Sequence, residues 1–330
     1  MDMVSRAVLF ASADARMPIG NKPLVLHALD DLIAADIRDV AVVAPAAVAD
    51  EVQALVDGGT AGGQATIHAI DGECAFLDAL GQLPLAAGLD PFVVHLGDSL
   101  THNGLRQAIQ GPPIAGNDAL ALVEKVDSRV KPLGTGLARQ RAAGIYVFGP
   151  GVLDLGPRQG DRHDELDLEI AAAAERLAEA GGRIEVRPVS DWWRSGRRPD
   201  AMLQANRFFL SGLRPGPTDA RLENTDLQGP VVLHPTARLT SAVVRGPVIV
   251  GADVEISDAY VGPYTSIGSN VVIENAEVEN SIILPEAAIR HLGSRLEASI
   301  VGRRARVFRD FRLPRAFRLT VGDGAEVALT

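Results

Sequence analysis

The chain has 330 residues, of which 47% are hydrophobic and 22% are charged, and its formal net charge is −10 at pH 7. This balance is typical of a folded protein with room for two domains, and the negative charge argues against a nucleic-acid partner, because phosphate backbones are bound by clustered Lys and Arg. No apolar stretch approaches the roughly 20 residues of a membrane span, and the single cysteine, Cys74, forms no intrachain disulfide, so we expect a cytoplasmic protein without a membrane partner.

The first half of the chain alternates short apolar runs with segments of helical periodicity. Strands are predicted over 7–10, 39–43, 65–70 and 92–96, and helices between them over 21–37, 48–56 and 77–85. In the first helix, Asn21 is the expected cap and Pro23 an early helical residue. The alternation predicts a mostly parallel sheet with helices on both faces. Ligands of such sheets lie beyond the carboxyl ends of the strands, which here are the turn after Phe10 and the Gly97-Asp98 turn.

The second half of the chain is an internal repeat. Its aliphatic residues are six positions apart within a group, and each group starts seventeen positions after the one before: Leu227, Leu233 and Leu239; Val244, Val250 and Ile256; Val261, Ile267 and Ile273; and then Val278 and Leu284. Hexapeptide spacing is typical of a parallel β-helix in which each short strand sends one aliphatic side chain inward. Gly251, Gly262, Gly268 and Gly302 suit its corners. Because the surfaces of such coils often pair between subunits, we expect a homo-oligomer.

Five segments spread over both halves carry a resemblance to a known family. Residues 191–207, which begin Asp-Trp-Trp-Arg-Ser, align without a gap on a family segment that begins Gly-Trp-Trp-Lys-Asp; residues 91–98 resemble the strand that delivers a metal-binding aspartate; residues 144–148 resemble a sheet segment on the sugar side; and residues 261–268 and 314–319 resemble β-helix and tail segments. The chain therefore resembles the sugar-1-phosphate nucleotidylyltransferases, in particular the long form of glucose-1-phosphate thymidylyltransferase.

The resemblance implies a Rossmann-like (GT-A-like) α/β nucleotidyltransferase domain over 1–218 and a left-handed parallel β-helix over 219–330. It also implies a reaction in which a sugar 1-phosphate attacks the α-phosphorus of a nucleoside triphosphate and pyrophosphate leaves. Catalysis of such a transfer consists of positioning and charge neutralisation. Carried over position by position, the family pattern makes Arg16 the catalytic arginine and Asp98 a ligand of Mg²⁺, and it assigns substrate binding to Ala11, Ser12, Asp78, Glu124, Gly144 and Glu165.

The phosphate turn departs from the family pattern. Where the family has Leu-Ala-Gly-Gly-x-Gly-Thr-Arg-Leu, this chain has Leu-Phe-Ala-Ser-Ala-Asp-Ala-Arg-Met over 9–17, so three glycines are missing and Asp14 adds negative charge. The stretch that carries the family's catalytic lysine is absent, and Ser195 stands where the family has its second metal-binding aspartate. Two hypotheses follow. The chain is a nucleotidylyltransferase with an altered site, or it is a silenced paralogue that binds a ligand or a partner protein.

Overall fold

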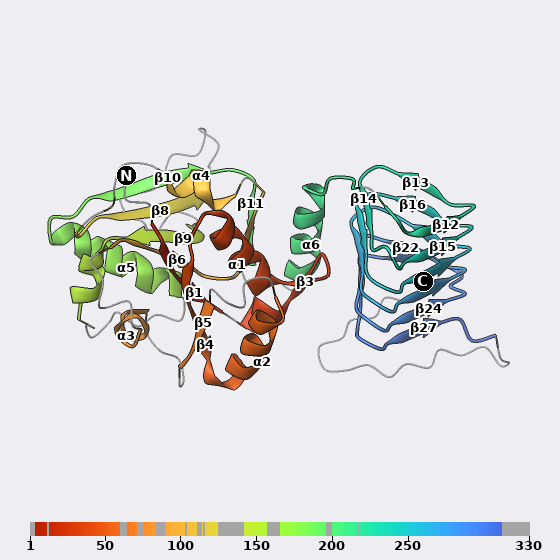
Figure 1. The fold of residues 1–330 in the computed structure, drawn as a ribbon, viewed down its shortest axis with the longest axis horizontal. Coiled ribbons are helices and arrows are strands. Elements are labelled where there is room, and N and C mark those ends of the chain that lie inside the picture. Colours follow the sequence, from red (N-terminus) through yellow and green to blue (C-terminus); the bar gives the residue numbers. More distant parts are fainter. Residues whose placement is uncertain are drawn as a thin grey trace.

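The computed structural model consists of an α/β domain and a β-helix, with helix α6 (Ala201–Ser211) between them (Figure 1). It describes residues 4–11, 13–59, 65–70, 76–83, 90–102, 104–110, 114, 116–124, 142–156, 166–195, 200–216 and 218–311. Throughout that part of the chain, every helix is too short or too polar to span a membrane.

A seven-stranded sheet forms the centre of the α/β domain, in the order β10-β8-β9-β6-β1-β4-β5. Strands β1, β4, β5 and β6 are parallel, whereas β9 is antiparallel to both of its neighbours, β6 and β8. The strands span β1 (Arg6–Phe10), β4 (Asp39–Pro45), β5 (Ala65–Ile70), β6 (Phe92–His95), β8 (Ala119–Glu124), β9 (Ala142–Phe148) and β10 (Ile184–Val189). The four strands predicted from the apolar runs are β1, β4, β5 and β6, so that prediction is confirmed.

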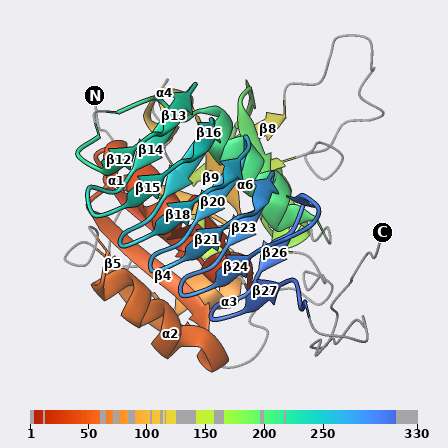
Figure 2. The same cartoon turned by 90° about the vertical axis from the view of Figure 1, so that its right-hand side faces the viewer.

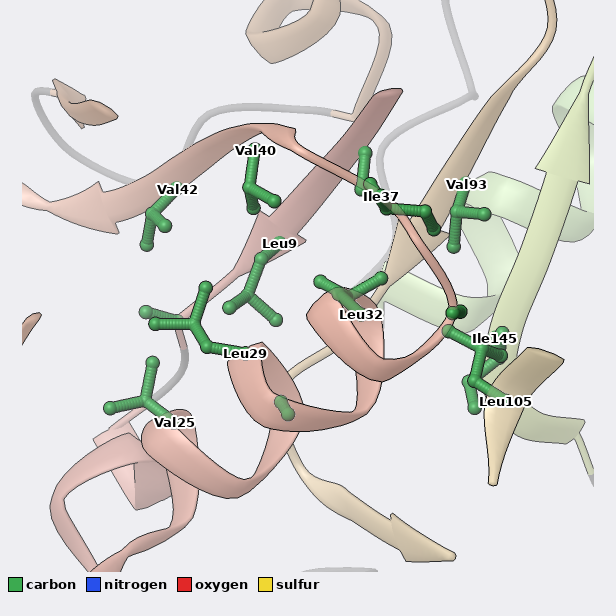
Figure 3. Packing of buried hydrophobic residues seen from close by; sticks show 14 of the residues in the cluster. Leu9, Val25, Leu29, Leu32, Ile37, Val40, Val42, Val93, Leu105 and Ile145 are labelled. Carbon is green, nitrogen blue, oxygen red and sulfur yellow. The ribbon is translucent and has the colours of Figure 1, made fainter. Parts of the chain in front are cut away.

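Helices cover both faces of this sheet, as the sequence predicted. One face packs against α1 (Leu24–Ala34), α2 (Ala46–Asp57) and α4 (Leu105–Ile109), and the other against α3 (Phe76–Gly81) and α5 (Leu166–Glu179). Leu29 and Leu32 of α1 point toward Leu9 of β1, and all three are fully buried (Figure 3). Their helical spacing therefore forms the apolar stripe that attaches α1 to the sheet.

The start of α1 differs from the prediction. The helix begins at Leu24, and Asn21 does not cap it. Instead, β2 (Pro18–Ile19) and β3 (Lys22–Pro23) pair as a short hairpin, in which Asn21 has a φ of 66°. Asparagine tolerates this left-handed conformation better than most residues. Its side-chain amide is thereby free to donate a hydrogen bond of 2.7 Å to the carbonyl of Ile267 in the β-helix.

The β-helix has three parallel sheets as its sides, and within each sheet the strands of successive coils stack along the axis; Figure 2 shows the strands of one sheet following each other in chain order. The first sheet contains β12 (Arg221–Glu223), β15 (Arg238–Thr240), β18 (Glu255–Ser257), β21 (Val272–Glu274), β24 (Ala288–Arg290) and β27 (Arg306–Phe308). The second contains β13 (Asp226–Gln228), β16 (Val243–Arg245), β19 (Tyr260–Val261), β22 (Glu277–Glu279) and β25 (Leu296–Glu297). The third contains β14 (Val231–Leu233), β17 (Val248–Val250), β20 (Thr265–Ile267), β23 (Ile282–Ile283) and β26 (Ile300–Val301). The predicted left-handed parallel β-helix is confirmed.

The register of the β-helix follows the predicted seventeen-residue period in the first coils and departs from it later. Val250 pairs with Ile267, as predicted, but Ile267 pairs with Ile283 and not with Leu284. The corner after Val278 is one residue shorter than the corner after Val261, so the inward position falls one residue earlier. Ile283 is fully buried, whereas Leu284 is half-buried, and the prediction for Leu284 was wrong.

Candidate functional site

The two turns that the sequence analysis singled out lie against each other at the carboxyl edge of the sheet. Gly97, directly before Asp98, has a φ of 64°, and a Cβ atom placed on it would lie 2.6 Å from the carbonyl oxygen of Phe10 at the end of β1. Only glycine combines this conformation with so close a contact. The Gly97-Asp98 turn is therefore fixed beside the end of β1.

A small two-stranded sheet brings Arg194 to this turn. Strand β7 (Ser99–Thr101) follows Asp98 and pairs antiparallel with β11 (Trp192–Arg194), so that Arg194 lies opposite Ser99. Beyond this pairing, the backbone N–H of Ser195 donates to the carbonyl of Asp98 at 3.0 Å. Segments nearly one hundred residues apart in the sequence thus place a guanidinium beside the Asp98 carboxylate.

The guanidinium of Arg194 lies between two carboxylates. Its Nε is 3.0 Å from Oδ1 and 2.9 Å from Oδ2 of Asp98, and its Nη1 is 2.6 Å from Oδ2 of Asp167 in α5. The hydroxyl of Tyr146 in β9 donates to Oδ1 of Asp167 at 2.8 Å. We call these four residues, Asp98, Tyr146, Asp167 and Arg194, the Asp98–Arg194 cluster.

Gly144 in β9 provides the space for the Asp98–Arg194 cluster. Because β9 runs antiparallel to β6, its first residues lie beside the carboxyl end of β6, and Leu96 donates to the carbonyl of Gly144 at 2.9 Å. Gly144 has a φ of 76°, and a Cβ atom there would lie 3.1 Å from Nε of Arg194 and 3.2 Å from Oδ1 of Asp98. The structure therefore brings together two of the predicted site residues, Asp98 and Gly144.

Burial changes the acid–base properties of the cluster. It raises the pKa of Asp98 to about 6, against the opposing effect of the Arg194 charge. Burial also raises the pKa of the Tyr146 hydroxyl well above 10, with Asp167 adding to the effect. Burial by itself would lower the pKa of Arg194, but the two carboxylates overcome it and the net pKa is raised, so the guanidinium stays charged. At neutral pH the cluster contains a permanent, partly buried cation.

His95, at the end of β6, is a packing residue. It is 1% exposed, and its Nδ1 accepts a hydrogen bond of 2.9 Å from the backbone N–H of Gly97. Burial lowers its pKa to about 3, and the charge of Arg194 contributes. The ring is therefore neutral at physiological pH and helps to hold the Gly97-Asp98 turn.

The turn after β1 continues as a short 3₁₀ helix over Ala13–Arg16. Ala11 is 3% exposed and its N–H donates to the carbonyl of Val43 at 2.8 Å, which extends the sheet by one residue. Arg16 is exposed and forms an ion pair with Glu51 of α2. Its guanidinium is thus accessible from solvent, and the only partner that the structure gives it within the described residues is on the protein surface.

The other predicted site residues are described only in part. Asp78 is half-buried in the first turn of α3, on the same side of the sheet as α5. Glu124 ends β8, and its side chain lies outside the described part of the structure, as do Ser12 and Glu165. Their roles in substrate binding stay predictions.

Sequence reasoning did not assign a role to Arg194, Tyr146 or Asp167, although Arg194 and Tyr146 lie inside segments that carry the family resemblance. One signal was present. Ser195, which stands where the family has its second metal-binding aspartate, directly follows Arg194, and the family segment also has a cation, Lys, at that position. The pairing of β7 with β11 was needed to show that this cation reaches Asp98.

The described residues do not provide the ligands that a resident Mg²⁺ requires. Within that part of the chain, no three His, Cys, Asp or Glu side chains gather closely enough to hold a metal ion. Both oxygens of Asp98, the predicted metal ligand, face Nε of Arg194. Mg²⁺ needs carboxylate oxygens that are open to it.

Comparisons with known proteins relate the whole chain to sugar nucleotidyltransferases, although no protein-family model matches it. The low-salt glycan biosynthesis nucleotidyltransferase Agl11 of Haloferax volcanii is 30% identical, over 95% of this chain and 93% of its own length. Glucose-1-phosphate thymidylyltransferases of Streptomyces griseus and Streptomyces antibioticus are 27% and 28% identical, each over 98% of this chain and 96% of its own length. A solved structure from Bacillus anthracis, assigned as a glucose-1-phosphate thymidylyltransferase in complex with sucrose, is 19% identical with a TM-score of 0.49, over 61% of this chain and 93% of that one.

Proposed function

The chain belongs to the sugar-1-phosphate nucleotidyltransferase family, and from this premise we propose that it transfers a nucleotidyl group from a nucleoside triphosphate to a sugar 1-phosphate. An oxygen of the sugar phosphate forms a bond to the α-phosphorus, the bond from that phosphorus to the bridging oxygen breaks, and pyrophosphate leaves. One structural observation supports the proposal above others. Four separate segments converge on a charged cluster at the carboxyl edge of the sheet, which is where open α/β sheets bind ligands.

The chemistry asks the protein for positioning and charge balance. The attacking phosphate oxygen is already ionised at neutral pH, so no general base is required, and no covalent intermediate is needed. In our proposal Arg16, with its exposed guanidinium, binds the triphosphate beside Ala11 and Ser12. Asp78 lies beside the nucleotide base. The sugar phosphate is bound by Glu124, Gly144 and Glu165.

Mg²⁺ is the counter-ion that the resemblance implies for the phosphates. In this chain Asp98 is engaged by Arg194, so the proposed mechanism contains no step through a metal held by the protein. Any divalent cation in the reaction is carried by the nucleotide.

Pyrophosphate release tests the proposed function. The full-length chain is incubated with each common nucleoside triphosphate and a panel of sugar 1-phosphates, and pyrophosphate is followed with a coupled phosphatase. We expect release that requires both substrates. Arg16→Ala should lower kcat/KM by about 100-fold, as the loss of a transition-state donor does. Arg6→Ala is the matched control, because Arg6 lies at the opposite end of β1, and it should leave the rate unchanged.

Absence of pyrophosphate with every substrate pair would overturn the proposal and favour the silenced paralogue. Equal rates for Arg16→Ala and Arg6→Ala would remove Arg16 from the catalytic site.

The proposal extends to assembly and location. We place the reaction in the cytoplasm, where nucleotides and sugar phosphates are available, and we propose a homo-oligomer formed through the β-helix. Light scattering on the purified chain tests the second point, since a mass equal to the 34.8 kDa of one chain would contradict it.

A further inference from the structure

A single guanidinium joins two carboxylates at the candidate site. Nε of Arg194 contacts Asp98 at 2.9 and 3.0 Å, and Nη1, bonded to the same carbon atom, contacts Asp167 at 2.6 Å. The two carboxylates therefore lie on either side of one small cation. A pair of acidic oxygens converging on one point is also the arrangement by which proteins hold divalent metal ions.

The surroundings hold the guanidinium in that place. The side chains of Asp98 and Arg194 are each 16% exposed and that of Asp167 is 26% exposed. Gly144 leaves room for the pair because it has no Cβ, and Nη1 lies 3.5 Å from the carbonyl oxygen of Ala142. Arginine is charged at every pH at which the protein is folded, so this cation is permanent.

We propose that Arg194 is a built-in cation that takes the place of a divalent metal ion between Asp98 and Asp167. The folded protein by itself therefore binds no divalent cation there. The significance of the exchange for catalysis rests on the proposed function, whereas the claim about metal binding does not.

Geometry and charge both exclude a second cation from this position. A divalent ion that reached Asp98 would have to displace Nε, because that group faces both carboxylate oxygens. It would also lie within a few ångströms of a like charge in a partly buried site, where repulsion is stronger than in water. Mg²⁺ in addition requires near-octahedral oxygen ligands and loses its own waters reluctantly.

Removal of the guanidinium should allow a divalent cation to bind between Asp98 and Asp167. In Arg194→Ala, Asp98 and Asp167 would face a vacated space that the carbonyl oxygen of Ala142 also borders. Two carboxylates and a carbonyl are hard oxygen ligands of the kind that Mg²⁺ and Mn²⁺ prefer. The variant should therefore gain the divalent-cation site that the natural chain lacks.

Titration with Mn²⁺ alone, followed by electron paramagnetic resonance and calorimetry, tests this inference. Because the chain has a net charge of −10 and weak surface binding is expected, each result is compared with its Asp98→Asn counterpart. We expect identical Mn²⁺ binding by the natural chain and by Asp98→Asn. Arg194→Ala should bind Mn²⁺ at least about tenfold more tightly than the natural chain, and Asp98→Asn introduced into it should abolish the gain.

The matched control is Arg187→Ala. Arg187 is a half-buried arginine of β10 whose guanidinium contacts the carboxylate of Glu185 and the carbonyls of Ala108 and Gln110, and among the described residues Glu185 is the one carboxylate that it contacts. Its loss leaves no pair of carboxylates, so no Mn²⁺ site should appear.

A Mn²⁺ site in the natural chain that Asp98→Asn removes would overturn the inference. A folded Arg194→Ala that binds Mn²⁺ no better than the natural chain would overturn it as well. If Arg194→Ala does not fold, Arg194→Met, which preserves the side-chain volume, replaces it, and the comparison of the natural chain with Asp98→Asn still decides the claim. Because none of these readouts is an activity, a failed pyrophosphate assay would reject the proposed function and leave this inference standing.

Discussion

Buried charges at the candidate site are arranged so that none is left uncompensated. Burying a charge is costly unless it is paired and hydrogen-bonded. Arg194 satisfies Asp98 and Asp167 at once, and Tyr146 adds a hydrogen bond to Asp167. The cost of an acidic pair at the carboxyl edge of the sheet is thus offset from within the chain, which is the residue-level reason that Arg194 replaces an external ion.

The glycine at position 144 gives a prediction about this packing. Gly144→Ala introduces a Cβ atom 3.1 Å from Nε of Arg194 and 3.2 Å from Oδ1 of Asp98, in a residue with a φ of 76°. Gly181→Ala is the control, since Gly181 has a φ of 87° and no atom within 4 Å of the same Cβ position. Both should lose about 1–3 kcal/mol of stability from backbone strain, and Gly144→Ala about 1 kcal/mol more. Equal denaturant midpoints for the two variants would show that the cluster does not depend on this space.

Asp31 of α1 gives a prediction about pH. Burial raises its pKa from 3.8 to about 6, although the Thr101 hydroxyl donates to it at 3.1 Å. The folded state therefore holds a proton that the unfolded state has released, and stability falls as the pH rises from about 4 to about 6. At about pH 4, Asp31→Asn should have the same free energy of unfolding as the natural chain. Above about pH 6, the free energy of unfolding of the variant should be higher by up to about 3 kcal/mol.

Urea unfolding at a series of pH values measures this effect. Asp50→Asn, at an exposed position of α2, is the control and should change nothing. A constant difference between Asp31→Asn and the natural chain at all pH values would contradict this, because it would mean that the pKa of Asp31 is the same in the folded and unfolded states.

At the scale of elements, the sequence predicted the features that recur along the chain, namely the buried strands of the α/β domain and the coils of the β-helix. Strands β1, β4 and β6 contain continuous runs of buried apolar residues because both faces of the sheet are covered there, whereas the edge strand β5 is only partly buried. The β-helix was visible because each coil places its inward side chains at the same spacing. One column of its corners lies in the left-handed region of φ, and its members are Asn224, Ser241, Asp258, Asn275 and His291. Polar residues such as Asn and Asp tolerate that region, so their regular spacing in the sequence also indicates the positions of the corners.

The sequence did not reveal where one coil is shorter than the next. A corner can lose a residue without changing the composition of the strands around it, so the period alone extended the count to Leu284. The structure places Ile283 inward instead, with no exposed surface.

Two neighbouring substitutions test this register. Ile283→Ala removes a fully buried side chain and should cost about 2–5 kcal/mol. Leu284→Ala removes a half-buried one and should cost about 1 kcal/mol. Thermal unfolding of both variants provides the comparison, and a larger loss for Leu284→Ala would restore the strict seventeen-residue period.

At the scale of the whole molecule, the two parts of the chain are joined by side chains whose role no local pattern indicates. Asn206 of α6 is 1% exposed; it accepts a hydrogen bond of 3.0 Å from the N–H of Gly20 and donates one of 3.2 Å to the carbonyl of Tyr264. The guanidinium of Arg207 lies 4.5 Å from the centre of the Tyr264 ring. The hairpin of β2 and β3 is thus attached to α6 and to the β-helix at one junction.

Contacts between distant segments were equally hard to predict at the candidate site. Asp98 and Gly144 were predicted because each lies in a segment that resembles the family pattern, and the structure brings them together. Arg194 and Asp167 meet Asp98 only through the pairing of β7 with β11 and the packing of α5, which are contacts between distant segments. Their consequence, a cation already in place, is a property of the folded chain and not of any one motif.

Phosphorus NMR of a single reaction mixture tests the central claim most directly. It contains the full-length chain, a nucleoside triphosphate with its own Mg²⁺, and a sugar 1-phosphate. We predict that, for at least one pair of substrates, the triphosphate signals decline while pyrophosphate and a nucleoside diphosphate sugar appear in equal amounts, and only when all three components are present. Spectra that stay unchanged for every pair, or that show only a nucleoside diphosphate and inorganic phosphate, would contradict the account.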